Sequence, residues 1–175
     1  AGFFDHTHAP VFFEKVLQPG GHEWTRTEQL KLCVEAGDPI GAPGKKFSYS
    51  DTGYIILGEI IENIQGKTLG EAIPEILDFK KLGLKNSAFE GLNSSIDQAR
   101  IHQYFQGKDT YVLDPTMDYF GGGGLLSTTE DLSRFFLALF HGKVFKNSST
   151  LEKLLEPITY SETPMMDYRI GIYRI

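Results

Sequence analysis

Hydrophobic residues recur at helical spacing in the stretch that precedes Gly66, and this is the strongest pattern in the chain. Steps of three and four residues place them on one face of a helix. We predict a helix from Asp51 or Thr52 to Gln65, ended by Gly66 because glycine accepts a left-handed backbone. Gly58 should permit a close crossing by a neighbouring element. We expect the apolar face to be buried, each side chain contributing roughly 1.5–3 kcal/mol before entropy is counted. That face comprises Ile56, Leu57, Ile60, Ile61 and Ile64.

Capping residues predict an earlier helix. Thr25 and Glu28 stand three positions apart, as in a capping box that satisfies the first free amides of a helix. The helix that they open should stop by Gly37. Its apolar face would carry Leu30, Cys33 and Val34.

Capping residues also predict later helices. Thr68 can cap a helix over residues 69–77, which Pro74 should kink or restart. Shorter helical patterns cover residues 11–17 and 150–155.

A run of glycines precedes one more helix. Ser127 or Thr128 can cap it, and Gly142 should close it. Its predicted apolar face comprises Leu132, Phe135, Phe136, Leu139 and Phe140.

The remaining patterns indicate little β structure. Two short extended segments predict a small hairpin near 99–113, and alternation over 168–175 predicts a strand. We therefore predict one domain over 1–175 that is mainly α with small β pieces (α+β). It would consist of an irregular lead-in over 1–24, a helical body over 25–160 and the final strand.

Composition excludes several classes of partner. The 175 residues carry a net charge of -6 without a cluster of Lys and Arg, which argues against nucleic acid. No apolar stretch approaches the length of a membrane span, and the opening residues lack the pattern of a signal peptide. Cys33 is the single cysteine, which we interpret as a small core residue. The run Gly121–Gly124 lacks the Lys-Ser/Thr pair of a phosphate loop, and we predict no cofactor.

The first residues contain metal-ligand types. Asp5, His6 and His8 combine a carboxylate with two imidazoles, and His22 is the nearest further candidate. A structural zinc site needs more ligands at a familiar spacing, so we favour a solvated loop and predict no metal. A metal-binding protein acting through His6 and His8 is the alternative.

Tyr49 is the first candidate for chemistry. The turn at Pro43-Gly44 leads to it, and the predicted helix starts two residues later. Amides at a helix N-terminus favour nearby negative charge. We therefore expect a phenol held partly as phenolate, or one that exchanges protons readily.

Three segments resemble the β-lactamase-related serine hydrolases, which include class C β-lactamases, D-alanyl-D-alanine carboxypeptidases and esterases. They are Tyr49-Ser50-Asp51-Thr52-Gly53-Tyr54, Leu82-Gly83-Leu84-Lys85-Asn86-Ser87, and the stretch from Gly121 to Leu132. The resemblance covers about Trp24 to Ile175. It implies the helical domain of the β-lactamase/transpeptidase-like fold, without most of its central sheet.

The resemblance also implies roles for particular residues. Tyr49 would be the catalytic tyrosine, and Gly123 and Gly124 would line the substrate cleft. Asp51 stands where the family has a substrate-contacting Asn. An ionised Asp accepts hydrogen bonds but cannot donate them, which leaves esterase-like or peptidase-like substrates open.

Two motifs of this family are absent from the chain. No serine is followed three residues later by lysine, and Thr150 with Lys153 has that spacing but the wrong hydroxyl. Lys67-Thr68 precedes Leu69 instead of the glycine of Lys/His-Thr/Ser-Gly.

We therefore interpret the chain as a piece of an acyl-enzyme hydrolase of amides or esters, inactive alone. Its expected partners are the missing sheet domain of the same protein and, in the full-length parent, a small-molecule or peptide substrate. The resemblance implies a periplasmic or extracellular parent. Both ends should then lie on the side of Tyr49, and an apolar patch should be exposed. The alternative is a non-catalytic binding or interaction module with a closed, polar surface there.

Overall fold

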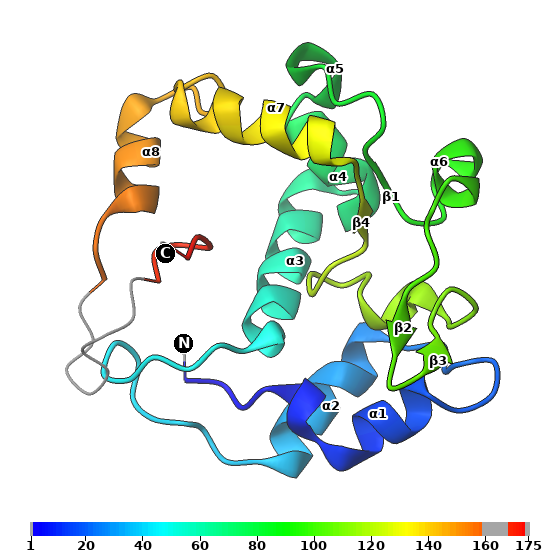
Figure 1. The fold of residues 1–175 in the computed structure, drawn as a ribbon. Helices are drawn as coiled ribbons and strands as arrows, with labels where there is room; N and C mark the ends of the chain where they lie inside the picture. Colours follow the sequence, from blue (N-terminus) through cyan, green and yellow to red (C-terminus); the bar gives the residue numbers. More distant parts are fainter. Residues whose placement is uncertain (1, 159–167, 174–175) are drawn as a thin grey trace.

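The computed structural model describes residues 2–158 and 168–173 (Figure 1). The helices are η1 (His6–His8), α1 (Pro10–Val16), α2 (Arg26–Ala36), α3 (Asp51–Gln65), α4 (Leu69–Ile76), α5 (Phe79–Leu82), α6 (Ser94–Gln98), η2 (Pro115–Met117), α7 (Thr129–Phe140) and α8 (Ser148–Leu155). The antiparallel strand pairs are β1 (Ala88–Phe89) with β4 (Leu125–Leu126), and β2 (Tyr104–Phe105) with β3 (Lys108–Asp109). The predicted class, mainly α with small β pieces, is confirmed.

The predicted caps are confirmed. Thr25 Oγ1 accepts the amide of Glu28 at 3.2 Å, while the Glu28 carboxylate accepts the amide of Thr25 at 2.9 Å. Thr68 forms the same capping box at the start of α4, and Thr128 caps α7. Gly66 ends α3 with a φ of 64°. These contacts span only three or four residues, so the local sequence suffices to specify them.

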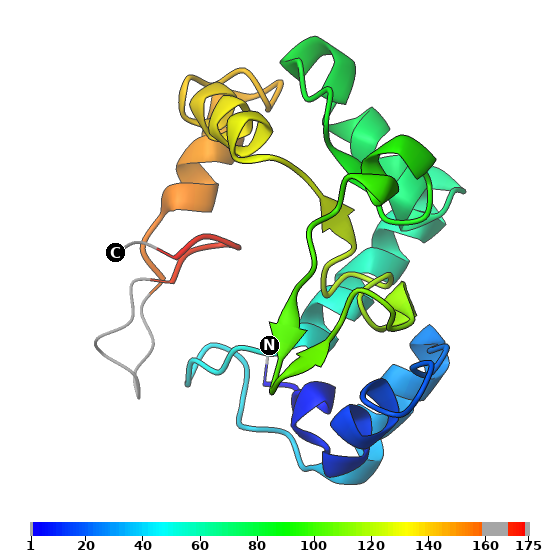
Figure 2. The ribbon, with the colours of Figure 1, turned by 45° about the vertical axis from the view of Figure 1, so that its right-hand side comes forward.

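Helix α3 stands at the centre of the ribbon, with η1, α2 and α4 in contact with it (Figures 1 and 2). It buries Thr52, Ile55 and Gly58. A Cβ at position 58 would lie 2.3 Å from the carbonyl oxygen of Phe120, so the predicted close crossing is confirmed.

The apolar face predicted for α3 is largely open. Leu57, Ile60 and Ile64 are 53%, 48% and 73% exposed, so the predicted burial of these side chains is wrong within the described residues. Helix α7 repeats the pattern: Leu139 is buried, whereas Phe136 and Phe140 are exposed. Periodicity identifies an apolar face, but it does not reveal whether the element that covers this face belongs to the same chain.

The lead-in is more ordered than predicted. Residues 6–8 form η1, and His6 is only 1% exposed, so the expected solvated loop is wrong. The amide of His6 donates to Thr52 Oγ1 at 3.1 Å, and the Asp5 carboxylate accepts the amide of Thr7. Burial lowers the pKa of the His6 imidazole. The lead-in is therefore anchored on the first turn of α3.

A small hydrophobic core packs α1 against the segment that precedes α2. It consists of Phe12, Val16 and Trp24. Cys33 is buried as predicted, and its thiol contacts the carbonyl oxygen of Phe4 at 3.2 Å. Val34, on the apolar face predicted for α2, is exposed. Across residues 2–158 and 168–173, no three His, Cys, Asp or Glu side chains form a group suited to a metal ion.

The β predictions need correction. The hairpin exists but is tighter than predicted, because Gln106 and Gly107 both take positive φ values of 50° and 76° in a two-residue turn. The strand predicted over 168–175 is wrong over 168–173, where a single bridge joins Tyr168 to Tyr173 around Gly171; residues 174–175 lie outside the described part. None of the helices in the described part is long and apolar enough for a membrane span.

Candidate active site

Tyr49 stands at the mouth of α3, as the sequence predicts. Ser50 has an extended backbone and precedes the first helical residue, Asp51. This geometry turns the phenol back over the helix start, where Tyr49 Oη donates to Asp51 Oδ1 at 2.9 Å. The ring is 47% exposed and therefore accessible to a second molecule.

Of the two states predicted for Tyr49, the partial phenolate is not favoured in this chain. Burial raises the pKa of Tyr49, and the hydrogen bond and negative charge of Asp51 raise it further. A carboxylate in the first turn opposes the positive end of the helix, and it stabilises the phenol over the phenolate. Tyr49 is therefore a neutral proton donor at neutral pH.

A cavity of about 300 Å³ opens beside Tyr49. Its lining residues are Phe3, Lys46, Phe47, Ser48, Tyr49, Ser50, Gly53, Tyr54, Ile56, Leu57 and Tyr168. Phe3 and Tyr168 belong to the first and last described segments of the chain, so both of these segments reach the side of Tyr49, in agreement with the prediction for the two ends.

Aromatic rings dominate the wall of this cavity. The centroid of Tyr49 lies 5.8 Å from that of Tyr54 and 6.4 Å from that of Tyr168. Phe47 lies 5.0 Å from Tyr168, and the hydroxyls of Tyr54 and Tyr168 are hydrogen-bonded. Sequence reasoning missed Tyr168, because no local pattern joins it to a residue 119 positions earlier.

The structure places Gly123 and Gly124 away from this cavity. The amide of Gly123 donates to the carbonyl oxygen of Asp118 at 3.0 Å, and the carbonyl of Gly124 accepts from Glu90 at 2.8 Å. Neither glycine is among the lining residues. Instead Gly121 meets α3, where a Cβ would lie 2.3 Å from the carbonyl oxygen of Tyr54. The substrate role of Gly123 and Gly124 stays a prediction.

Asp118 is a further ionisable group that the sequence did not single out. Burial raises its pKa, and the nearby charge of Asp51 acts in the same direction. The loop from Asp118 to Gly121 thus brings a second carboxyl toward the start of α3. Only the folded loop reveals this proximity.

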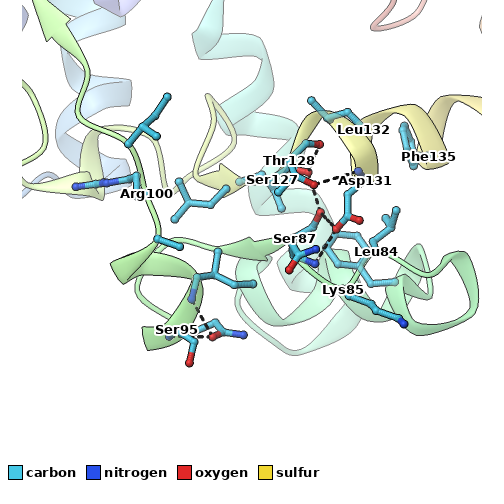
Figure 3. Close-up of a pocket in the computed structure, with 18 of the residues that line it drawn as sticks. Leu84, Lys85, Ser87, Ser95, Arg100, Ser127, Thr128, Asp131, Leu132 and Phe135 are labelled. Atoms are coloured by element: carbon cyan, nitrogen blue, oxygen red, sulfur yellow. Dashed lines mark hydrogen bonds between the residues drawn. The ribbon is translucent and has the colours of Figure 1, made fainter.

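A larger cavity of about 890 Å³ lies beside the start of α7 (Figure 3). Within its wall the Asp131 carboxylate accepts the amide of Asn86 at 2.7 Å and the hydroxyl of Ser87 at 2.9 Å. Ser87 and Ser127 share a further hydrogen bond of 2.8 Å. These hydrogen bonds connect Asn86 and Ser87, which follow α5, to the start of α7. None of the four predicted site residues lines this cavity.

Comparisons with known proteins point to one family. The family model described as Beta-lactamase matches residues 8–161. The human serine beta-lactamase-like protein LACTB, mitochondrial, is 34% identical over 147 residues, which are 79% of this chain and 26% of that protein. Teichoic acid D-alanine hydrolase of Staphylococcus aureus (strain MRSA252) is 27% identical over 95% of this chain and 44% of its own length.

A solved structure adds a likeness in fold. The D-stereospecific amidohydrolase from Streptomyces sp. superposes with a TM-score of 0.80 and 26% sequence identity. The superposition covers 97% of this chain and 52% of that one. The chain therefore spans roughly a quarter to a half of these relatives.

Proposed function

The chain belongs to the β-lactamase family, and on this premise we propose that it is the helical part of a larger serine hydrolase. Acyl-enzyme chemistry needs a nucleophile and an activating base, which this family takes from Ser-x-x-Lys. Because that motif is absent, the chain alone turns over no substrate. The limited share of each relative that the chain covers supports this proposal.

Tyr49 is the residue that carries the proposal. Its Oη lies at an exposed helix mouth, is protonated and is oriented by Asp51. In the full-length protein, the phenol breaks its hydrogen bond to Asp51 and gives its proton to the oxygen or nitrogen of the leaving group as the acyl group passes to serine, while the serine proton passes to the lysine of Ser-x-x-Lys. A positioned acid of this kind contributes roughly 10²–10⁴-fold to the rate.

Asp51 favours a substrate that donates a hydrogen bond at this position. Its carboxylate only accepts, whereas the family's Asn can also donate. The relatives named teichoic acid D-alanine hydrolase and D-stereospecific amidohydrolase support a substrate that is an ester or amide of a small acyl group.

The exposed apolar side chains support a missing domain. Leu57, Ile60 and Ile64 form a stripe along α3, and α7 exposes Phe136 and Phe140. Large exposed apolar surfaces mark sites where another element docks. A non-catalytic module with a closed, polar surface does not account for them. The missing sheet domain would cover these side chains and bring the nucleophile to Tyr49.

Two assays test this proposal. The 175-residue chain should hydrolyse neither nitrocefin nor p-nitrophenyl acetate. If the flanking gene sequence supplies Ser-x-x-Lys and Lys/His-Thr/Ser-Gly, Tyr49→Phe in that protein should lower kcat/KM by roughly 10²–10⁴-fold. Tyr104→Phe, on the exposed hairpin, is the matched control and should leave kcat/KM unchanged.

Either of two results would contradict the proposal. Saturable turnover by the chain alone, lost in Tyr49→Phe, would show that the catalytic apparatus is complete without further segments. Full activity of Tyr49→Phe in the longer protein would remove Tyr49 from the mechanism.

A further inference from the structure

The buried imidazole of His6 lies against the first turn of α3, which carries the group that orients Tyr49. We propose that His6 is a positioning residue for Tyr49, whose neutral form fixes this turn and whose protonated form loosens it. Granted the hydrolase function proposed above, protonation of His6 lowers the rate. The lead-in reaches the same site elsewhere, because Phe3 lines the cavity beside Tyr49. Phe4 also accepts the hydroxyl of Ser50 at 3.3 Å.

Thr52 joins His6 to the start of α3. Thr52 Oγ1 accepts the main-chain amide of His6 at 3.1 Å, and His6 Nδ1 lies 3.1 Å from the same oxygen. A hydroxyl has one proton and two lone pairs, so the amide takes a lone pair while the proton can go to Nδ1. Neutral imidazole with its proton on Nε2 accepts that proton, and this arrangement satisfies both groups.

Protonation of His6 breaks this match. Nδ1 then carries a proton, so Thr52 Oγ1 faces two donors and its own proton loses the imidazole as an acceptor. The imidazolium also attracts the carboxylate of Asp51, whose charge acts on His6. That carboxylate accepts the Tyr49 hydroxyl at 2.9 Å, and its attraction to His6 competes with this hydrogen bond. Tyr49 is therefore oriented less firmly.

Two carboxylates act on the imidazole, and neither keeps it charged at neutral pH. Asp5 Oδ1 lies 3.9 Å from Nδ1, and Asp51 contributes from the start of α3. Helix α1 presents the ring of Phe12, with centroids 5.1 Å apart, and no charge of α1 or α2 acts on His6 in the described part of the chain. Burial outweighs both carboxylates and lowers the pKa of His6, so the change of state falls below pH 6.5.

NMR of the chain tests the link without any turnover. The ¹³Cζ resonance of Tyr49, assigned with Tyr49→Phe, reports its hydrogen bond, and the ¹³Cε1 resonance of His6 reports the imidazole. Between about pH 7.5 and 4.5, the Tyr49 resonance should shift with the midpoint of His6. His6→Asn places an amide oxygen near Nδ1 and takes up no proton, so it should abolish this shift. His8→Asn, on the exposed side of η1, is the matched control and should retain it.

Two further variants separate this link from other effects. Thr52→Val removes the hydroxyl with little change in shape and should lose most of the shift, which keeps the test decisive if His6→Asn does not fold. Burial raises the pKa of Asp118, and Asp118 acts on the charge of Asp51. Asp118→Asn should nevertheless retain the shift at the midpoint of His6. Far-UV circular dichroism checks that each variant folds.

Kinetics of the longer protein test the positioning role itself. His6→Leu removes the acceptor and should lower kcat roughly tenfold with KM unchanged, because orientation of the proton donor matters in the transition state. His6→Asn should restore kcat at pH 7.5 and keep a larger share of it at pH 5.5 than the unmodified protein does. His8→Asn should follow the unmodified protein at both pH values.

A Tyr49 resonance that does not move with His6, or that still moves in folded His6→Asn, would overturn the proposal. An unchanged kcat in His6→Leu would do the same. These results leave the hydrolase proposal standing, because that proposal depends on the turnover of Tyr49→Phe in the longer protein. A fully active Tyr49→Phe would instead remove the hydrolase role of Tyr49 and leave intact the link measured on the chain alone.

Discussion

The two sides of α3 have opposite surroundings, although both carry side chains suited to burial. One side packs Thr52, Ile55 and Gly58 against η1, α2, α4 and the loop around Phe120. The other side exposes Leu57 and Ile60. The packed side holds this chain together, while the exposed side has the composition of a core that the described residues leave open. An apolar face therefore does not by itself stabilise a fold.

The largest expected effect on stability comes from a substitution on the packed side of α3. Ile55→Ala should lower the free energy of unfolding by about 2–5 kcal/mol, because it leaves a cavity among buried neighbours. Urea denaturation of the chain measures the change. Ile60→Ala, on the exposed side, is the control and should change stability by no more than about 0.5 kcal/mol. Similar losses for both variants would show that the exposed side is covered in solution.

Two glycines of α3, Gly58 and Gly53, differ in the space around them. Gly58→Ala should destabilise the chain by about 1–3 kcal/mol, because its methyl group meets the rigid carbonyl of Phe120. Gly53→Ala has open space around the new methyl group and should be neutral or stabilising by up to about 1 kcal/mol. Thermal unfolding of both variants measures the difference. A neutral Gly58→Ala would mean that the Phe120 loop does not pack on α3.

The smallest expected effect is on the pH dependence of stability, and it comes from His6, which lies on the packed side of α3. Burial lowers its pKa below 6.5, so between the folded pKa and 6.5 the unfolded chain binds the proton and the folded chain does not. The stabilising contribution is therefore full above pH 6.5 and is lost as the pH falls toward the folded pKa. His6→Gln should flatten this part of the stability profile, measured as Tm between pH 7.5 and 5.5. His141→Gln, beyond the end of α7, serves as the control; an unchanged slope in His6→Gln would assign the effect to other groups.

Much of the candidate site was predictable from sequence. Tyr49 and Asp51 are two residues apart at a helix start, so their contact follows from local backbone geometry. Tyr168 and Asp118 were not predictable, because they reach this region only when distant segments meet. The phenolate was predicted wrongly, since the helix dipole was weighed without the burial and the carboxylate that oppose it.

Local sequence patterns sufficed to predict the longer helices α2, α3, α4 and α7, their caps and the place of Tyr49 at the start of α3. Those features depend on contacts within one helical turn, such as Thr25 with Glu28 and the left-handed Gly66. The tertiary structure alone decided which face of α3 is packed, that His6 is buried, and that Phe3 and Tyr168 share a cavity with Tyr49. Burial and charge depend on neighbours far away in sequence, and hydrophobic periodicity carries no record of which neighbour is present.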